Sequence, residues 1–327
     1  MTQPFRTQTG GRIDRTRPVR FTFDGTRLDG YAGDTLASAL LANGTHLVGR
    51  SFKYHRPRGI LSAGSEEPNA LVTIDRGGGR ITPNLRATQV ELYDGLTASS
   101  QNRYPSLRFD LGGLAGLASP LLSAGFYYKT FMWPRSFWHR LYEPAIRQAA
   151  GLGRAPEAAD PDRYLHQYAH CDLLVIGGGP AGLAAALGAS QTGQRVILCD
   201  EQAEFGGSLL TDAGVTIDGW LAGDWVREAL GTLGASITLL PRTTAFGWYP
   251  DNLIGLAERV TDHLADAGDR LPRERLWQVR AARVVLATGA IERPLVFPGN
   301  DRPGVMLADA ARSYATRYGA RRPGRAP

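Results

Sequence analysis

One glycine-rich turn constrains the fold of this chain more than any other feature. Residues 177–182 read Gly-Gly-Gly-Pro-Ala-Gly, and they stand between an apolar run at 171–176 and an alanine-rich stretch that ends near Gly193. The apolar run is typical of a buried parallel strand, and the alanine-rich stretch is typical of a helix. Strand, turn and helix in this order predict the G-x-G-x-x-G unit of a Rossmann-like dinucleotide-binding domain.

The residues around this turn indicate a nucleotide site. Gly177 permits the tight turn, Gly179 lets the main chain approach a pyrophosphate, and Gly182 allows close packing of helix on strand. A second strand at 195–199 ends in Asp200, where a carboxylate accepts hydrogen bonds from ribose hydroxyls and repels the 2′-phosphate of an NADP-type ligand. A glycine-rich packing turn without a ligand is the alternative. The pattern does not choose between NAD and FAD, because both present an ADP moiety.

Three later segments are expected to complete this site. Residues 206–208 offer further main-chain amides, residues 243–245 open a strand beside the adenosine, and residues 283–289 form a buried strand that ends in a small-residue turn. The predicted cofactor-binding residues are Gly177, Gly179, Pro180, Ala181, Gly182, Asp200, Glu201, Gly207, Ser208, Ala245, Thr288 and Gly289.

The N-terminal region predicts a different kind of domain. Asp24 and Gly25 stand between two alternating runs, which is a strong hairpin signal. Asp34 is expected to cap a helix that starts at Leu36 and stops at Asn43 and Gly44. A hairpin followed by a helix is how a ferredoxin-like β-grasp fold begins. The fold class is therefore α+β followed by α/β: a β-grasp domain and then a Rossmann-like FAD/NAD(P)-binding domain.

A loop at 56–69 follows, and it precedes a predicted strand at 70–74. In a plant-type ferredoxin this loop holds an iron–sulfur cluster with the spacing C-x4-C-x2-C. When that spacing starts at Ser62, its other two positions fall on Glu67 and Ala70, so we expect no iron–sulfur cluster. The only cysteines, Cys171 and Cys199, are expected to be buried small hydrophobes in strands.

Metal, nucleic-acid and membrane functions are not predicted. His166, His170 and Cys171 are too loosely spaced to indicate a metal site. The net charge of +6 comes almost wholly from scattered arginines, which indicates a solvated surface. No apolar run reaches the roughly 20 residues of a membrane span. The arginine-rich start resembles a transit peptide in charge, but Gly10, Gly11 and Pro18 would break an amphipathic helix and no apolar secretion segment is present. We therefore expect a cytoplasmic protein with a loose basic arm.

The length of 327 residues suggests about two domains. We expect a basic N-terminal arm (1–17), a ferredoxin-like β-grasp domain without cluster ligands (18–101), a connecting region (102–163), an FAD/NAD(P)-binding domain resembling pyridine nucleotide-disulphide oxidoreductases (164–319) and a basic tail (320–327). Aromatic residues crowd the connecting region. They are expected to form an inter-domain or inter-subunit packing surface rather than a single-stranded nucleic-acid site: Phe126, Tyr127, Tyr128, Phe131, Trp133, Phe137, Trp138 and Tyr142.

Four runs together carry a family resemblance along nearly the whole chain: residues 51–59, 124–134, 177–182 and 287–294. They resemble the N-terminal part of the α subunits of heterotetrameric sarcosine oxidases. That resemblance implies a complex with β, γ and δ subunits that demethylates sarcosine to glycine, passes the one-carbon unit to tetrahydrofolate and forms hydrogen peroxide. It implies NAD on the α subunit, FAD and the substrate site on β, FMN at the α–β boundary, and zinc on the smallest subunit.

The resemblance also carries over to single residues. Ala181, Asp200, Glu201 and Ser208 match NAD contacts of the family, and Ala245 matches by position with a substituted side chain. Gln202 stands where the family often has an arginine. No catalytic residue is expected in this chain.

The family α subunits are far longer than this chain, so we expect a truncated or frame-shifted product that ends inside the nucleotide-binding domain. Two other functions stay open. One is an FAD-dependent oxidoreductase subunit of the thioredoxin reductase or amine and opine dehydrogenase type, although a redox cysteine pair is missing. The other is a structural subunit that binds no nucleotide.

Overall fold

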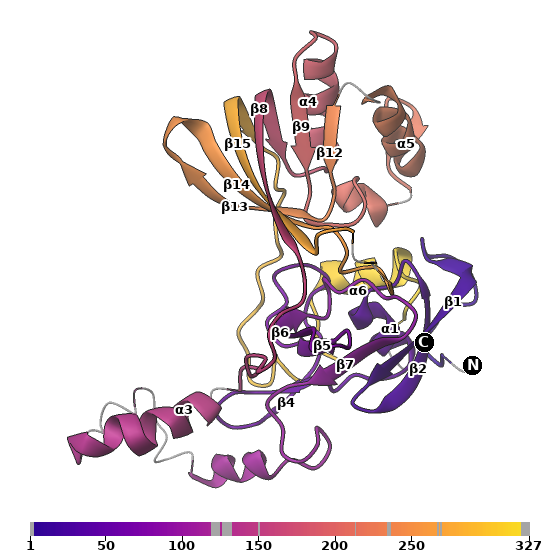
Figure 1. Ribbon diagram of the computed structural model, residues 1–327. Helices are drawn as coiled ribbons and strands as arrows, with labels where there is room; N and C mark the ends of the chain where they lie inside the picture. Colours follow the sequence, from indigo (N-terminus) through magenta and orange to yellow (C-terminus); the bar gives the residue numbers. More distant parts are fainter. Residues whose placement is uncertain are drawn as a thin grey trace. The chain divides into compact units, whose positions relative to one another are not determined.

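The computed structural model describes residues 3–118, 125, 133–149, 151–212, 214–233, 237–266, 268 and 270–321. The chain forms two compact units (Figure 1): the first comprises Met1–Pro161 and Glu292–Pro327, and the second comprises Asp162–Ile291. The chain therefore leaves the first unit, builds the second and returns to the first.

A five-stranded sheet is the centre of the first unit. Its order is β2-β1-β7-β5-β6, and only β1 and β7 pair in parallel. Its strands are β1 (Asp14–Phe23), β2 (Thr26–Ala32), β5 (Leu71–Asp75), β6 (Ile81–Arg86) and β7 (Leu96–Ser100), and a separate short pair is formed by β3 (Gly49–Arg50) and β4 (Pro57–Arg58). The hairpin predicted at Asp24 and Gly25 is confirmed, since both have the positive φ values, 49° and 78°, that a type I′ turn requires.

Helix α1 (Leu36–Ala42) is buried along its whole length. The prediction that Asp34 caps it is wrong: Thr35 is the N-cap, and Ser38 N donates to Thr35 Oγ1 at 3.2 Å. Asp34 instead accepts 2.6 Å hydrogen bonds from Ser38 Oγ and the Arg6 guanidinium. The predicted stop is confirmed, because Asn43 is the C-cap and Gly44 has a φ of 78°.

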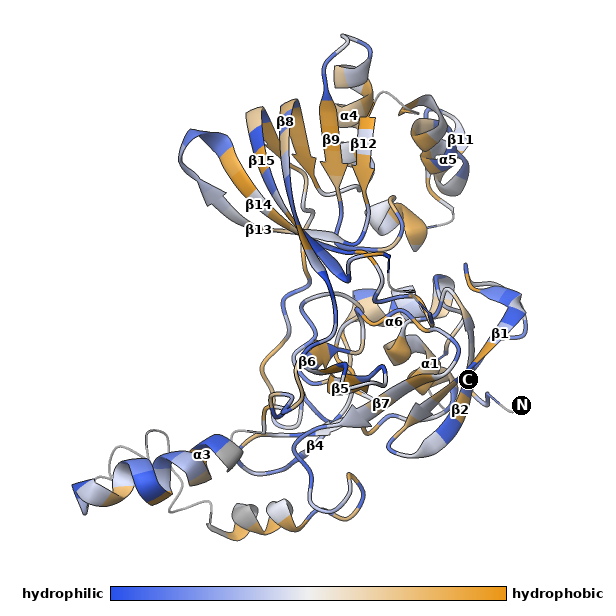
Figure 2. Cartoon of the chain, in the orientation of Figure 1, coloured by the Kyte–Doolittle hydropathy of each residue, from blue (hydrophilic) through white to orange (hydrophobic). Residues whose placement is uncertain are grey.

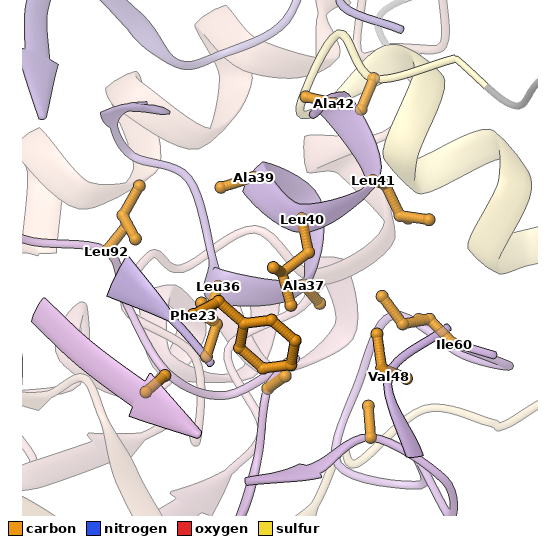
Figure 3. Close-up of a cluster of buried hydrophobic side chains, with 14 of the residues drawn as sticks. Phe23, Leu36, Ala37, Ala39, Leu40, Leu41, Ala42, Val48, Ile60 and Leu92 are labelled. Carbon is orange, nitrogen blue, oxygen red and sulfur yellow. The ribbon is translucent and has the colours of Figure 1, made fainter. Parts of the chain in front are cut away.

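The core of the first unit joins the sheet, α1 and the end of the chain. Figure 3 shows Phe23, Leu36 and Leu40 packed together, with Val48 and Ile60 nearby. Ala310 and Tyr314 of α6 (Ala308–Thr316) belong to the same buried cluster. This division differs from the predicted one, which assigned residues up to 319 to the nucleotide-binding domain, because α6 buries its apolar face in the first unit.

The N-terminal segment is not the loose arm that we expected. Arg6 forms a 2.6 Å ion pair with Asp34, and both side chains are almost fully buried. Thr7 N donates to the carbonyl of Gly319 at 2.8 Å, and Arg12 N donates to that of Arg317 at 2.6 Å. The first residues are therefore tied to the segment after α6.

The described part of the connecting region includes short helical segments: η1 (Leu111–Ala118), η2 (Arg135–Phe137), the π-helix η3 (Trp138–Tyr142) and α3 (Glu143–Ala149). Trp133 and Phe137 are exposed, by 82% and 46%. Four of the predicted aromatic residues, Phe126, Tyr127, Tyr128 and Phe131, lie outside the described residues. The packing surface assigned to this region stays a prediction.

The second unit is built on a six-stranded sheet of order β12-β9-β8-β15-β14-β13. The first four strands are parallel, and β14 and β13 add antiparallel. The strands are β8 (Tyr164–Ile176), β9 (Val196–Cys199), β12 (Ile237–Leu240), β13 (Thr243–Tyr249), β14 (Leu253–Arg259) and β15 (Glu274–Leu286). Minor elements are η4 (Gly207–Leu210), β10 (Thr216–Ile217), β11 (Trp220–Leu221) and η6 (Pro250–Asn252).

Alternating side chains give this sheet two buried faces. Leu173 and Val175 of β8 pack with α4 (Pro180–Ser190) and α5 (Ala222–Leu233), whereas Leu174 packs on the opposite face with β14 and β15. Figure 2 shows the apolar colouring of β8, β9 and β12. Cys171 and Cys199 are buried in the second of these faces, which confirms the prediction of buried cysteines.

Within the described residues, no helix is long and apolar enough to cross a membrane. The same residues contain no group of three or more His, Cys, Asp or Glu side chains placed to hold a metal ion.

Candidate nucleotide-binding site

The turn after β8 has a conformation that only glycine fits. Gly177 has a φ of 103°, and a Cβ on it would lie 2.3 Å from the carbonyl oxygen of Ala287. Gly182 is buried, and its Cβ would lie 1.8 Å from the carbonyl oxygen of Gly177. Both separations are below any contact that a carbon atom tolerates. The first and last glycines of the motif therefore serve the tight turn and the helix packing predicted for them.

The N-terminus of α4 lies directly after this turn. Gly179 is the N-cap, no side chain caps the helix, and Pro180 stands in the first turn. The first-turn N–H groups of a helix have no acceptor within it, and the helix dipole adds positive potential there. A Cβ on Gly179 would meet only the Cα of Gly207, at 3.9 Å. Main-chain donors are thus presented where a pyrophosphate is expected.

Asp200 follows β9 and binds the turn itself. Its Oδ2 accepts a hydrogen bond from Gly178 N at 2.7 Å, and its Oδ1 accepts one from Gln202 N at 2.8 Å. A carboxylate has about four acceptor positions, so it can bind several donors at once. Asp200, which is predicted to bind the ribose, is therefore also an anchor of the glycine turn.

A second glycine turn lies against the first one. Gly206 N donates to the carbonyl of Gly178 at 2.8 Å, and Gly207 has a φ of 54°. A Cβ on Gly207 would lie 2.9 Å from the Cα of Gly179. Ser208 follows in η4 and is exposed. Residues 206–208 thus lie beside the motif, but Gly206 N already has an acceptor, and a contact of Gly207 or Ser208 with a nucleotide stays a prediction.

Ala245 lies on a strand that borders the turn, and Thr288 and Gly289 lie just after another such strand, β15. Thr243 N donates to the Asp200 carbonyl at 2.7 Å, which starts β13 beside Asp200, and the half-buried Ala245 follows on that strand. On the other side, Ala287 N donates to the Ile176 carbonyl at 2.8 Å, and Thr288 and Gly289 follow it. The predicted residues therefore gather around one turn of the second unit, and their contact with a nucleotide stays a prediction.

Two residues at this site were not predicted. The ring of Phe205 packs against Gly178, where a Cβ would lie 2.2 Å from its Cδ1. Arg259 Nη2 donates to the carbonyl of Glu201 at 2.7 Å. The hairpin of β13 and β14 explains the position of Arg259, because its register pairs Thr243 with Glu258 and Thr243 N donates to the Asp200 carbonyl.

The thiols near the site are not reactive groups. Burial raises the pKa of Cys199 to about 12, and the neighbouring Asp200 adds to the shift. Burial likewise raises the pKa of Cys171 to about 11. Both thiols are therefore protonated at neutral pH, and the thiolate is the form that reacts.

Comparisons with protein families agree with this two-unit organisation. Residues 16–103 match the family of 2Fe-2S iron-sulfur cluster binding domains. Residues 172–269, which include the glycine turn and Asp200, match the family of FAD dependent oxidoreductases. The first unit thus resembles a ferredoxin-type domain, and the second unit resembles the FAD/NAD(P)-binding domain of oxidoreductases.

Individual relatives narrow this class. The chain is 61% identical, over 99% of its length, to the sarcosine oxidase subunit alpha of Rhizobium meliloti (strain 1021), and 43% identical, over 95%, to that of Corynebacterium sp. (strain U-96). It covers 33% and 28% of these two proteins, so it spans about a third of the length of the curated relatives that it matches. The chain is therefore homologous to sarcosine oxidase α subunits, which confirms the predicted resemblance.

A solved structure shares the fold. The L-proline dehydrogenase from P. horikoshii superposes on 98% of this chain and 49% of its own, with a TM-score of 0.63 and 23% sequence identity. At this identity the likeness concerns the fold alone.

The first unit matches a cluster-binding family, but its residues do not fit a cluster. Cys171 and Cys199 are the only cysteines, and neither lies within residues 16–103. Thiolates are the ligands that iron–sulfur clusters of this type require. Residues 16–103 therefore supply no thiolate for such a cluster, and the absence of a cluster stays a prediction.

Proposed function

We propose that this chain is the NAD-binding part of the α subunit of a heterotetrameric sarcosine oxidase. The complex would demethylate sarcosine to glycine, pass the one-carbon unit to tetrahydrofolate and form hydrogen peroxide. The observation that carries the nucleotide part is the uncapped N-terminus of α4 beside Asp200. The homology to sarcosine oxidase α subunits supports the reaction.

Each part of the site has a task in this proposal. The main-chain donors at the start of α4 would hold the pyrophosphate, and Asp200 would accept from the adenosine ribose. The Asp200 carboxylate disfavours a 2′-phosphate, so NAD is preferred over NADP. When bound, NAD supplies hydride transfer. The chain itself contributes binding and orientation, and we assign it no catalytic residue.

The rest of the proposal concerns the assembly. The partners would be the β, γ and δ subunits, with FMN at the boundary to β, and the complex would be cytoplasmic. Neither a nucleic acid nor a membrane is a proposed partner.

FAD is the second candidate for the same site, because residues 172–269 match an FAD dependent oxidoreductase family. A flavin that copurifies would give the protein a yellow colour and a flavin absorbance spectrum. If FAD copurifies and NAD gives no binding heat, FAD replaces NAD in this proposal.

Calorimetric titration with NAD tests the site. Asp200→Ala removes the ribose acceptor and the anchor of the turn, so we expect it to weaken NAD binding by about 1–3 kcal/mol, or roughly tenfold to a hundredfold. The matched control is Asp172→Ala. Asp172 pairs with Arg195, the residue before β9, whereas Asp200 follows that strand.

The outcomes of this titration separate the candidates. Weaker binding by the Asp200 variant alone supports the proposal, and equal binding by both variants contradicts the ribose role. Neither heat nor a thermal shift with NAD or FAD for the unaltered chain would favour a structural subunit without nucleotide.

A further inference from the structure

The loop between β4 and β5 contains a buried acid at its centre. The Glu67 side chain is 1% exposed, and its carboxylate accepts four main-chain hydrogen bonds. Oε2 accepts from the N–H groups of Leu61 at 2.9 Å and Ser62 at 2.7 Å. Oε1 accepts from those of Asn69 at 2.8 Å and Ala70 at 3.0 Å. One side chain thus closes the loop from both ends.

These contacts join the three positions that a ferredoxin spacing selects. Ser62, Glu67 and Ala70 stand at the C-x4-C-x2-C positions. In this structure the middle position supplies the anion, and the two outer positions donate their N–H groups to it. The Ser62 hydroxyl is buried and has no hydrogen-bond partner among the described residues. The loop therefore folds around the Glu67 carboxylate, which belongs to the chain itself.

Helix α6 and the residue before it pack against the same loop. Leu307 N donates to the carbonyl of Leu61 at 2.8 Å, just before α6 begins. The Tyr314 hydroxyl of α6 donates to the carbonyl of Ser62 at 2.8 Å, and that side chain is buried. Residues 61 and 62 thus donate N–H groups to Glu67 on one side and accept from the α6 segment on the other.

We propose that Glu67 is an internal anion that takes over the organising task of an iron–sulfur cluster in this loop, and that it thereby forms the docking surface for α6. The first unit then acts as a rigid scaffold and carries no electrons. All four partners of the carboxylate are donors, so only an ionised carboxylate satisfies them. A glutamine or a protonated acid would direct a hydrogen atom at an N–H group.

Burial raises the pKa of the Glu67 carboxyl, and the four N–H donors act in the opposite direction. The four N–H donors therefore offset part of the cost that burial imposes on the ionised carboxylate. These hydrogen bonds make the loop and the carboxylate a single structural unit.

The adjacent residue Glu66 offers a matched control. It is half-buried and makes none of the four contacts. In the full chain, we expect Glu67→Gln to raise the unfolding equilibrium constant roughly tenfold to a hundredfold more than Glu66→Gln does, measured by urea denaturation. Hydrogen exchange in residues 61–70 should accelerate in the Glu67 variant only. Equal behaviour of the two variants would overturn the proposal.

Two measurements on the unaltered chain keep the proposal testable if Glu67→Gln does not fold. The amides of Leu61, Ser62, Asn69 and Ala70 should exchange slowly, and fast exchange contradicts the proposal. Anaerobic incubation with ferrous iron and sulfide should leave the protein without bound iron and sulfide and without cluster absorbance. A reconstituted cluster would show that Glu67 does not occupy the centre of the loop.

Discussion

The two units present main-chain N–H groups in opposite ways. In the loop at 61–70 of the first unit, four N–H groups donate to the Glu67 carboxylate of the same loop. In the second unit, the first turn of α4 has no side-chain cap, and only Gly178 N of the preceding turn is taken by Asp200. The first loop supplies its own anion, whereas we propose that the N–H groups at the start of α4 bind an anion of the nucleotide.

This difference shows what a family match can and cannot transfer. Both units match families that are described by a cofactor. In the first unit the fold persists although cysteines are absent from the matched residues, and we propose that a buried carboxylate with four N–H donors organises the loop. In the second unit the glycines that allow close approach of a ligand are all present. To infer a cofactor, the group that the main-chain amides of a loop face is therefore more informative than the fold of the domain.

The largest loss of stability and of nucleotide binding is expected from a substitution beside the glycine turn of the second unit. Gly182→Ala places a Cβ 1.8 Å from the carbonyl oxygen of Gly177, and this oxygen cannot move without shifting the turn. We expect a loss of about 1–3 kcal/mol in the free energy of unfolding. We also expect NAD binding to disappear from calorimetric titration, because the displaced turn no longer presents its amides.

Gly188 in the same helix is the control for this change. A Cβ there meets no atom within 4 Å, so Gly188→Ala should stabilise α4 by about 0.5–1 kcal/mol through helix propensity and leave NAD binding intact. If both variants bind NAD as the unaltered chain does, the turn is not the nucleotide site.

A smaller loss of stability is expected from a substitution at the contact between α6 and the loop at 61–70. Tyr314→Phe removes the hydrogen bond to the Ser62 carbonyl, which should cost about 1 kcal/mol of unfolding free energy at neutral pH. Tyr104→Phe is the control, because Tyr104 is 68% exposed in the same unit and its change should have almost no effect. Equal losses for the two variants would mean that the Tyr314 hydroxyl contributes nothing to docking.

The unfolding free energy that Tyr314→Phe loses should decrease as pH rises. Burial raises the pKa of Tyr314 well above its ordinary value of about 10, and Glu67 adds to the shift. The folded state then holds the proton more tightly than the unfolded state, so the stabilisation is present below about pH 10 and is lost as pH rises. The stability difference between the unaltered chain and Tyr314→Phe should therefore shrink above about pH 10 in urea titrations.

Local features could be predicted from the sequence because neighbouring residues determine them. The hairpin at Asp24 and Gly25, the helix stop at Gly44 and the glycine turn all depend on φ values that few residue types adopt. The candidate nucleotide site followed from the same logic. In parallel strands the carboxyl ends meet at one edge, so β8, β9 and β15 bring their terminal residues together.

The features that could not be predicted depend on contacts between distant parts of the chain. Tyr314 and Ser62 are 252 residues apart, and no local pattern indicates that α6 returns to the first unit. Likewise, the ligand spacing located Glu67 but not its role, because glutamate is usually exposed and only the folded loop supplies four donors. The prediction of Asp34 as the N-cap of α1 is wrong because the Asp34 carboxylate accepts hydrogen bonds from Arg6 and Ser38 instead.

The smallest expected effect tests whether the two units open independently. Cys171 and Cys199 are the only thiols, both are buried in the second unit, and burial raises their pKa values to about 11 and about 12. Labelling by a thiol reagent near neutral pH therefore requires opening of that unit.

Under these conditions Gly182→Ala should accelerate labelling, because it destabilises the second unit, whereas Glu67→Gln should leave the labelling rate unchanged. Mass spectrometry of the labelled chain over time gives both rates. If Glu67→Gln accelerates labelling as much as Gly182→Ala does, the units unfold as one. The carboxylate of the first unit would then also stabilise the nucleotide-binding fold.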